Sequence, residues 1–421
     1  MIKRDASARL LNLWKEFPVV IVSGARQVGK TTLVNLLSRR LQIAQRVTLD
    51  HSGSRERAGQ DPELFVQGLA RPAFLDEAQK SPSLFEAIKQ EVDQHRHPGQ
   101  FILSGSANFL LLKKVSESLA GRSARLFLRG VSIRELLERT EKPPHLSDCL
   151  KARSAQDLLD RCRATCRQVQ LSPREWSRHI VSGRFPELAV RRRTESFQIS
   201  WMENYVDAFI EKDLPDLGNV RSRAEFGHFW RVTTSTVAQL RDLSQMGRAL
   251  GVSYHTAGRY LALLEQGCHL FRLEPYYANI GKRLTKAPKL FSEDTGLGLF
   301  LSGVRGIEQL EASDRRGNWL ENSAIAELKS TIEIFFPGTQ LWFWRTLSGA
   351  EVDLVIEQGR QLLPIEIKWS SRPHRMECKG LESFLHDFKS QAPFGVVACG
   401  VNEPFFLTER LVAVPLSWLV T

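Results

Sequence analysis

The residues with the clearest chemical potential form a glycine-containing loop near the amino end: Gly24, Ala25, Arg26, Gln27, Val28, Gly29, Lys30 and Thr31. An apolar run, Val19–Val22, precedes this loop, and a helix-forming segment, Thr32–Leu41, follows it. A strand, a turn with the spacing G-x-x-x-x-G-K-[ST] and a helix together bind phosphate, because backbone N–H groups and the helix N-terminus carry partial positive charge. The loop therefore predicts a binding site for a nucleoside triphosphate.

Side chains of this segment extend the predicted site beyond the backbone. Lys30 is placed to reach the β- and γ-phosphates, and Thr31 offers its hydroxyl group to Mg²⁺. Thr32, at the start of the helix-forming segment, belongs to the same set of expected nucleotide contacts. Arg26 could contact a phosphate group or face the solvent, and the sequence leaves both interpretations open. The expected ligands are ATP and Mg²⁺.

A second motif supplies the carboxylates that phosphate transfer to water requires. The apolar run Ala73–Leu75 ends in Asp76 and Glu77. Asp76 at a strand end would hold Mg²⁺ through water, and Glu77 could polarise the attacking water molecule. An apolar-Asp-Glu sequence alone is weak evidence. Its place downstream of a phosphate-binding loop makes ATP hydrolysis the favoured interpretation.

Two further segments could sense or stabilise the γ-phosphate. The run Phe101–Ser104 continues to Ser106 and Asn108, which stand where a γ-phosphate sensor is expected, although a loop-capping role is the alternative. Arg122 could supply positive charge to the γ-phosphate of a neighbouring subunit, which would require a homo-oligomer. The alternative for Arg122 is an ion pair on the surface.

Short apolar runs alternate with amphipathic stretches in the first third of the chain. The expected strands are Val19–Val22, Arg46–Asp50, Ala73–Asp76, Phe101–Ser104 and Ala124–Leu128. The expected helices are Thr32–Leu41, Ser83–Gln94 and Phe109–Leu119. Alternation of this kind predicts an α/β fold with a doubly wound parallel sheet, the architecture of P-loop NTPases.

A helix-turn-helix pattern lies in the middle of the chain, where residues 150–265 are expected to be mostly helical. Leu243–Leu250 and His255–Glu265 are the two helix candidates, and a turn at Gly251 joins them. The run Leu270–Leu273 could then begin a wing-like hairpin. Two helices joined by a short glycine-containing turn are typical of DNA-binding helix-turn-helix units.

The charge distribution makes DNA a candidate partner. The formal net charge is +11 at pH 7, and residues 151–193 carry eleven Lys and Arg against four Asp and Glu. Clusters of this sign bind polyanions through counterion release. The alternatives are a solvated basic face and a helix-turn-helix unit that packs on its own neighbours. The expected DNA contacts are Ser253, Tyr254, His255, Arg259, Lys282, Arg283, Lys286 and Lys289.

Acidic residues near the carboxyl end form a second candidate site. A hairpin turning at residues 358–360 would bring Asp353 beside Glu366. Both carboxylates could then hold Mg²⁺, while Lys368, on the same strand face as Glu366, could orient or deprotonate the attacking water. Glu321 on the preceding helix could complete the cluster. This arrangement would support metal-assisted phosphodiester hydrolysis. Two alternatives remain: an inactive nuclease-like fold that only binds, and plain surface charge.

Several motifs resemble those of a prokaryotic AAA+-type ATPase family: Gly-Ala-Arg-Gln-Val-Gly-Lys-Thr-Thr, Phe-Leu-Asp-Glu-Ala-Gln, Leu-Ser-Gly-Ser and Glu-Ser-Leu-Ala-Gly-Arg. Members of that family join a P-loop domain to a C-terminal domain whose function was long unknown. The resemblance implies an ATPase core, a winged-helix segment and a terminal fold like that of restriction endonucleases, in which the positions of Asp353, Glu366 and Lys368 are catalytic. Two departures are the long, basic segment 139–175 and Arg184, which stands where a second glycine is usual.

These observations predict three parts: an ATPase domain over residues 1–138, a helical and winged-helix region over 139–300, and a nuclease-like α/β domain over 301–421. The expected function is Mg²⁺-dependent ATP hydrolysis that drives rearrangement of a DNA-binding, nuclease-like region. A nucleotide-switched DNA-binding regulator with an inactive nuclease-like domain is the alternative. No apolar run is long enough to span a bilayer, and the six cysteines are scattered, so a cytoplasmic protein with reduced thiols and no membrane partner is expected.

Overall fold

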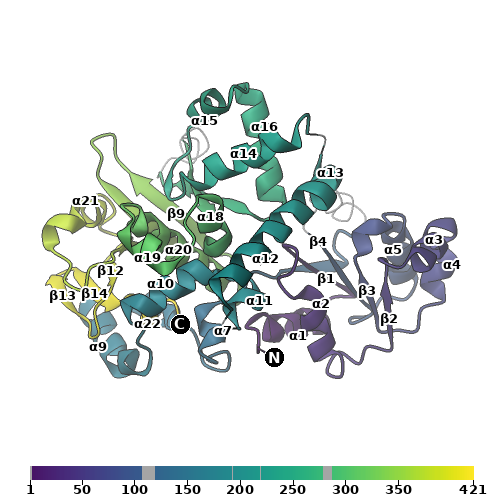
Figure 1. The fold of residues 1–421 in the computed structure, drawn as a ribbon. Helices are drawn as coiled ribbons and strands as arrows, with labels where there is room; N and C mark the ends of the chain where they lie inside the picture. Colours follow the sequence, from purple (N-terminus) through teal and green to yellow (C-terminus); the bar gives the residue numbers. More distant parts are fainter. Residues whose placement is uncertain (1, 107–118, 192, 219, 278–286) are drawn as a thin grey trace. The chain divides into compact units, whose positions relative to one another are not determined.

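The computed structural model describes residues 2–106, 119–191, 193–218, 220–277 and 287–421 (Figure 1). Packing groups the chain into two compact units. The first unit consists of residues 1–131, 206–221 and 262–269, and the second consists of residues 132–205, 222–261 and 270–421. The three-part division expected from the sequence stays a prediction.

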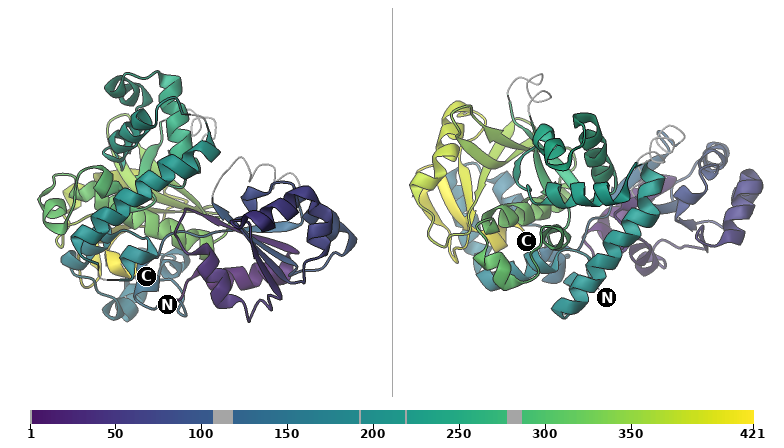
Figure 2. Two further views of the ribbon diagram at one scale, coloured as in Figure 1. Left: turned by 45° about the vertical axis from the view of Figure 1, so that its right-hand side comes forward. Right: turned by 45° about the horizontal axis from the view of Figure 1, so that its top comes forward.

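A five-stranded parallel sheet organises the first unit, with the strand order β2-β3-β4-β1-β5. Every residue of the interior strand β1 is buried, which explains why its sequence begins with the apolar run Val19–Val22. Helices flank the sheet (Figure 2), so the predicted doubly wound α/β fold is confirmed. The strands are β1 (Val19–Gly24), β2 (Gln45–Thr48), β3 (Ala73–Asp76), β4 (Phe101–Ser106) and β5 (Ser123–Phe127).

The helices of this unit are amphipathic and short. In α5, Leu84, Ile88 and Val92 are buried at the four-residue spacing that places them on one face. The helices are α1 (Ala6–Glu16), α2 (Lys30–Leu37), α3 (Ser52–Gln60), α4 (Pro62–Gln67), the 3₁₀-helix η1 (Ala78–Lys80) and α5 (Leu84–Gln94). Of these, α1, α3 and α4 were not expected, and the helix predicted over Phe109–Leu119 falls on residues 107–118, outside the described part.

Two later segments of the chain complete the first unit, and residues 206–221 form one of them. This segment begins with the last residues of helix α12 (Glu195–Ala208), which continues without a break into the π-helix η3 (Phe209–Asp213) and α13 (Leu214–Leu217) (Figures 1 and 2). The last residues of α16 (Tyr254–Gln266) and the turn after them form the other segment. A side chain at Gly267 would lie 2.8 Å from the ring of Phe209, so glycine lets the two segments pack closely.

A nine-stranded mixed sheet organises the second unit, with the order β13-β14-β12-β11-β10-β9-β7-β8-β6. Strands β10 and β11 form the predicted antiparallel hairpin, and Gly359 in its turn has a φ of 60° that glycine adopts without strain. The strands are β6 (Gln239–Leu240), β7 (Leu270–Pro275), β8 (Lys289–Ser292), β9 (Gln340–Arg345), β10 (Glu351–Gln358), β11 (Gln361–Ile367), β12 (Gly395–Cys399), β13 (Phe405–Thr408) and β14 (Leu411–Pro415).

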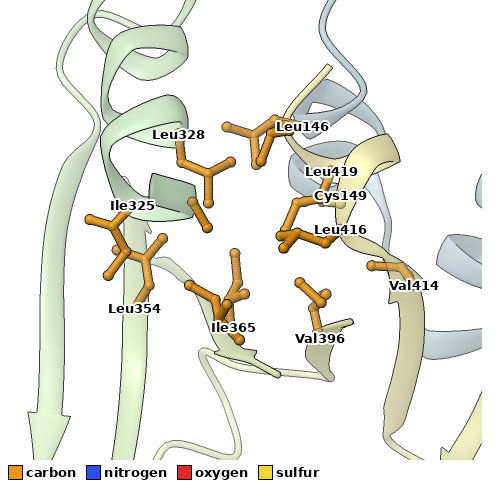
Figure 3. Packing of buried hydrophobic residues seen from close by; sticks show 14 of the residues in the cluster. Leu146, Cys149, Ile325, Leu328, Leu354, Ile365, Val396, Val414, Leu416 and Leu419 are labelled. Atoms are coloured by element: carbon orange, nitrogen blue, oxygen red, sulfur yellow. The ribbon is translucent and has the colours of Figure 1, made fainter. Parts of the chain in front are cut away.

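The core of the second unit lies between this sheet and several helices. Figure 3 shows side chains of α20, β10 and β11 pointing toward those of α8 and α22, and the residues drawn here are buried. The helices are α7 (Ile133–Leu136), α8 (Leu146–Lys151), α9 (Ala155–Thr165), η2 (Cys166–Gln168), α10 (Pro173–Ser182), α11 (Pro186–Ala189), α14 (Arg223–Thr234), α15 (Leu243–Leu250), α18 (Thr295–Leu301), α19 (Ile307–Ala312), α20 (Arg316–Phe335), η4 (Arg375–Cys378), α21 (Lys379–Asp387) and α22 (Leu416–Leu419).

The predicted helix-turn-helix pattern corresponds to α15 and α16. Gly251 ends α15 in the left-handed conformation, with a φ of 66°. Strand β7 pairs antiparallel with β8, as a wing-like hairpin requires, but it also pairs in parallel with β9 and so forms part of the large sheet. A winged-helix function for this segment therefore stays a prediction. In the described part of the chain, no helix is both long and apolar enough to cross a membrane.

Candidate functional site

The phosphate-binding loop connects β1 to α2 in the first unit. Gly24 has a φ of 152°, and a Cβ atom on it would lie 2.2 Å from the carbonyl oxygen of Leu128. Gly29 has a φ of 95°, and Gln27 adopts a left-handed φ of 62° that non-glycine residues rarely accept. The loop backbone is therefore held in an unusual conformation, and glycine is required at its start by the neighbouring chain.

Lys30 lies in the first turn of α2 and is only 7% exposed. Its Nζ atom donates to the carbonyl oxygens of Gly24 at 3.1 Å and Ala25 at 2.8 Å. Burial lowers the pKa of Lys30, while the carboxylate of Glu77 acts in the opposite direction. A buried ammonium group that faces the phosphate loop is the donor that a triphosphate tail requires.

Asp76 and Thr31 meet at the carboxyl ends of the strands. Thr31 Oγ1 donates to Asp76 Oδ2 at 2.9 Å, and the hydroxyl group of Ser104 on β4 donates to the other oxygen of Asp76. A carboxylate and a hydroxyl oxygen are the ligands that Mg²⁺ prefers, so these residues fit the metal. Thr32, the next residue, is exposed on α2.

Glu77 follows Asp76 with a left-handed φ of 55°, a backbone conformation that non-glycine residues rarely adopt. Gln79 Nε2 donates to Glu77 Oε2 at 2.5 Å, and this bond holds the carboxylate in one orientation. Gly105 permits this contact, because a Cβ atom there would lie 2.2 Å from the amide oxygen of Gln79. The arrangement fits the role predicted for Glu77 as the residue that orients water.

The remaining predicted residues of this site have different surroundings. Arg122 forms an ion pair with Asp93, with bonds of 2.5 and 2.7 Å, which corresponds to the alternative interpretation from the sequence. Its action on a neighbouring subunit stays a prediction. The backbone of Ser106 pairs with Gly24, and Asn108 lies outside the described residues.

Arg4 also supports the phosphate loop, although no sequence pattern predicted this role. Its buried guanidinium donates to the carbonyl oxygens of Val28 at 2.9 Å and Arg129 at 2.6 Å. The amino-terminal segment thus supports the phosphate loop from a position 24 residues away. An arginine in a short polar segment near an end of the chain looks like a surface residue, and no local pattern distinguishes it.

Comparisons with known proteins identify the domains of this chain and its relatives. Three family models match successive parts of the chain: an AAA domain over residues 16–137, a domain of unknown function (DUF8612) over residues 173–308, and a second domain of unknown function (DUF4143) over residues 316–419. The uncharacterized protein Rv2008c of Mycobacterium tuberculosis is 31% identical over 420 residues, a match that covers all of this chain and 85% of the relative. The chain therefore belongs to a family of P-loop ATPases in which an AAA domain is joined to a DUF4143 domain.

Other similar proteins were found in sequence and structure. The uncharacterized protein Mb2031c of Mycobacterium bovis is also 31% identical, over 100% of this chain and 85% of its own length. Among solved structures, the Thermotoga maritima RuvB Holliday junction branch migration motor is 18% identical, with a TM-score of 0.28 and coverage of 64% of this chain and 90% of that one.

A cluster of carboxylates in the second unit of this P-loop ATPase contains the other predicted residues. Asp353 on β10 accepts a hydrogen bond from the backbone N–H of Ile367 at 2.8 Å, and Lys368 pairs with Glu366 at 2.8 Å. Burial, followed by the charge of Asp353, raises the pKa of Glu366 to about 8. The same two causes raise the pKa of Glu321 on α20 to about 8.

Lys289 provides a buried positive charge inside this cluster. Its Nζ atom lies 2.9 Å from Glu321 Oε1 and 2.5 Å from Glu351 Oε1. Burial alone would lower the pKa of Lys289, but the nearby carboxylates of Glu321, Asp353 and Glu351 raise it. Lys289 is 2% exposed, so its expected contact with a DNA phosphate is wrong. The pattern of charges around residue 289 could not distinguish a buried lysine from an exposed one.

The metal role predicted for this cluster stays a prediction. Among the described residues, no group of three or more His, Cys, Asp or Glu side chains is arranged to hold a metal ion. The ammonium group of Lys289 supplies the countercharge that a divalent cation would otherwise provide to Glu321 and Glu351. Asp353 and Glu366 are nevertheless brought together by the hairpin, as the sequence predicted.

The two glutamates with a raised pKa predict that stability depends on pH. Glu321 and Glu366 bind protons in the folded state up to about pH 8, whereas their ordinary pKa is 4.5. The stability that this proton binding contributes is present at low pH and is lost as the pH rises through 8. We expect the thermal unfolding midpoint of the second unit to fall by at least about 3 °C between pH 6 and pH 9.

Tryptophan fluorescence measures this transition, because eight of the nine tryptophans, all except Trp14, lie in the second unit. Glu321→Gln should remove a large part of the fall between pH 6 and pH 9. The exposed Glu308→Gln serves as the matched control and should leave the pH dependence unchanged. An equal pH dependence in wild type and Glu321→Gln would contradict the assignment.

Arg184, the departure from the family pattern, has a structural role in the same unit. Its guanidinium is buried, lies 3.2 Å from a carboxylate oxygen of Glu327, and donates to the hydroxyl group of Ser330 at 2.6 Å. Against the effect of burial, Arg184 and His179 lower the pKa of Glu327. The long side chain that replaces glycine is therefore paired inside the protein.

The basic segment 151–193 is partly neutralised by the protein itself. Arg161 pairs with Asp157 at 2.7 Å, and Arg167 pairs with Glu403 at 2.7 Å. Arg193 pairs with Glu187 as well. Ion pairs of this kind reduce the positive potential that a polyanion would experience.

Proposed function

We propose that this protein is a Mg²⁺-dependent ATPase whose turnover rearranges a DNA-binding, nuclease-like region. The observation that carries the proposal is the convergence of Lys30, Thr31, Asp76 and Glu77 at one edge of a parallel sheet. Thr31 and Asp76 would hold Mg²⁺, which supplies charge neutralisation for the phosphates when it is bound. Residues 24–32 would cradle the triphosphate.

Each side chain has a distinct task in the proposed reaction. Lys30 exchanges its bonds with the loop carbonyl oxygens for bonds with phosphate oxygens and stabilises their growing charge. Glu77, oriented by Gln79, accepts a hydrogen bond from the attacking water and takes its proton as the water attacks. Asp76 accepts bonds from Thr31 and Ser104, whereas Glu77 accepts a bond from Gln79, so one residue serves the metal and the other serves the water.

The proposal predicts that Glu77→Gln separates binding from hydrolysis. This variant keeps the size of the side chain and its bond to Gln79 but removes its basicity. We expect phosphate release to fall by about 100-fold or more, while the dissociation constant for ATP changes little. Phosphate release and calorimetry measure the two quantities, each with and without duplex DNA, so that coupling to DNA is tested in the same experiment.

The exposed Glu56→Gln on α3 is the control and should keep wild-type turnover. Turnover that persists in Glu77→Gln would refute the role of Glu77. A wild-type protein without ATP hydrolysis would favour the alternative, a nucleotide-switched DNA-binding regulator.

DNA binding by the helix-turn-helix segment is part of the same proposal. Ser253, Tyr254, His255 and Arg259 are exposed at the beginning of α16, where a recognition helix makes its contacts. Their exposure supports phosphate contacts, which position a protein on DNA without selecting sequence. Lys282, Arg283 and Lys286 lie outside the described residues.

For the nuclease-like cluster, the lysine at its centre favours binding without cleavage. Lys289 already neutralises Glu321 and Glu351, so a catalytic Mg²⁺ would have to displace a buried ammonium group. We therefore expect the purified protein with Mg²⁺ or Mn²⁺ to cleave DNA no faster than Asp353→Ala. Gel analysis of end-labelled DNA measures the rate, and faster cleavage by the wild type would establish Asp353, Glu366 and Lys368 as catalytic.

A further inference from the structure

A carboxylate from a distant segment contacts the phosphate loop. Arg26 Nη1 donates to Asp213 Oδ1 at 2.8 Å, across 187 residues of sequence, and both atoms belong to the first unit. The side chain of Arg26 is 39% exposed and that of Asp213 is 25% exposed. This pair gives Arg26 a partner within the protein, and its contact with a phosphate group stays a prediction.

The backbone that carries Asp213 is unusual. Asp213 is the last residue of the π-helix Phe209–Asp213. Helices of this type are rare and are frequently found at functional sites. The start of the π-helix is fixed by packing, since the ring of Phe209 contacts that of His269 edge-on with centroids 4.2 Å apart. The contact with Arg26 is therefore made by a segment that packing holds at Phe209 and again at the buried Leu214.

The charge of Asp213 acts directly on the nucleotide site. Its carboxylate is among the groups that oppose the lowering of the Lys30 pKa. Burial raises the pKa of Asp213 itself, while Arg26 acts in the opposite direction. A triphosphate placed in the loop would meet Arg26 as an attractive group and Asp213 as a repulsive one. Arg26 cannot form a close ion pair with both the phosphate and Asp213 at the same time.

We propose that Asp213 is a nucleotide-sensing, positioning residue that competes with the triphosphate for Arg26. This inference rests on the proposed ATP binding by residues 24–32. Binding of the phosphate tail draws Arg26 away from Asp213 and leaves the Asp213 carboxylate next to like charge. The π-helix then loses one of its contacts. Because the π-helix is continuous with α12, and residues 195–205 of α12 belong to the second unit, the loss of this contact also affects α12.

A double-mutant cycle tests the competition. Affinities for ADP and for a slowly hydrolysed ATP analogue are measured by calorimetry in Mg²⁺ buffer. Asp213→Asn, which keeps the shape and removes the charge, should tighten binding of the analogue by about threefold or more, and Arg26→Gln should weaken it. In the double variant, the gain from Asp213→Asn should disappear. Glu211→Gln, an exposed carboxylate on the same π-helix, should leave affinity unchanged.

Hydrogen exchange tests the sensing step without relying on turnover. In the wild type, the analogue should speed exchange of the amides of residues 209–217, and in Arg26→Gln it should not. Weaker binding by Asp213→Asn, additive effects in the double variant, or exchange that nucleotide does not change would each overturn the inference. A wild type that binds no nucleotide would remove the proposed function as well, whereas normal binding with any of these results removes only the inference.

Discussion

Replacing Lys30 by alanine is expected to lower ATP turnover by about 100-fold or more. Lys30 is a buried ammonium group whose Nζ atom already faces two carbonyl oxygens of the phosphate loop. In a site of low dielectric constant its charge stabilises the phosphate oxygens of the transition state far more than in water. Phosphate release at saturating ATP measures the effect, and calorimetry shows how much of it arises from weaker binding.

Lys89→Ala is the matched control, because Lys89 lies in the same unit on α5 and pairs with Glu86 at the surface. This variant should retain wild-type turnover. If Lys30→Ala hydrolyses ATP as fast as Lys89→Ala does, the phosphate loop is not the site of hydrolysis and the proposed function fails.

At pH 9, above the pKa of about 8 of Glu321, replacing Lys289 by methionine is expected to lower the free energy of unfolding of the second unit by about 3–5 kcal/mol. Methionine matches the lysine stem in volume, so the loss comes from charge rather than packing. Glu321 and Glu351 would lose their shared partner, and the buried Asp353 beside them would lose the positive charge that opposes the effect of its burial. The unfolding midpoint should fall by about 10 °C, as measured by tryptophan fluorescence.

The partner residue provides the test of cause. Adding Glu321→Met to Lys289→Met should restore a large part of the lost stability, because both buried charges are then absent. Lys389→Met, at an exposed position of the same unit, should change the midpoint little. A midpoint that Lys289→Met leaves unchanged would show that the ion pairs contribute nothing to folding.

Elements with a strong local pattern were predictable from the sequence. Strand β3 and helix α15 have the predicted bounds, Ala73–Asp76 and Leu243–Leu250, because an apolar run or an amphipathic repeat defines each of them. The β10–β11 hairpin and its turn at Gly359 were also predicted. The phosphate loop was recognisable because its chemistry depends on backbone conformation and residue spacing, which are local.

Contacts between distant segments were not predictable in the same way. Arg4, Asp213 and Lys289 each contact a predicted site, yet their neighbours in sequence give no sign of it. Arg4 supports the phosphate loop and Asp213 pairs with it, while Lys289 neutralises Glu321 across 32 residues. Only the three-dimensional arrangement brings these charges together. Lys289 illustrates this difference, because its place in a basic segment predicted a contact with DNA although the residue is buried.

The composition of the first unit decides how the chain can be divided in the laboratory. Residues 206–221 and 262–269 pack with residues 1–131, although long stretches that belong elsewhere separate them. A recombinant fragment that stops near residue 138 would retain the phosphate loop, Asp76 and Glu77 but lack Asp213 and the close packing of Phe209 against Gly267. Catalytic studies therefore need a polypeptide that extends at least through residue 269, and exchange of modules between homologues would require several crossovers instead of one.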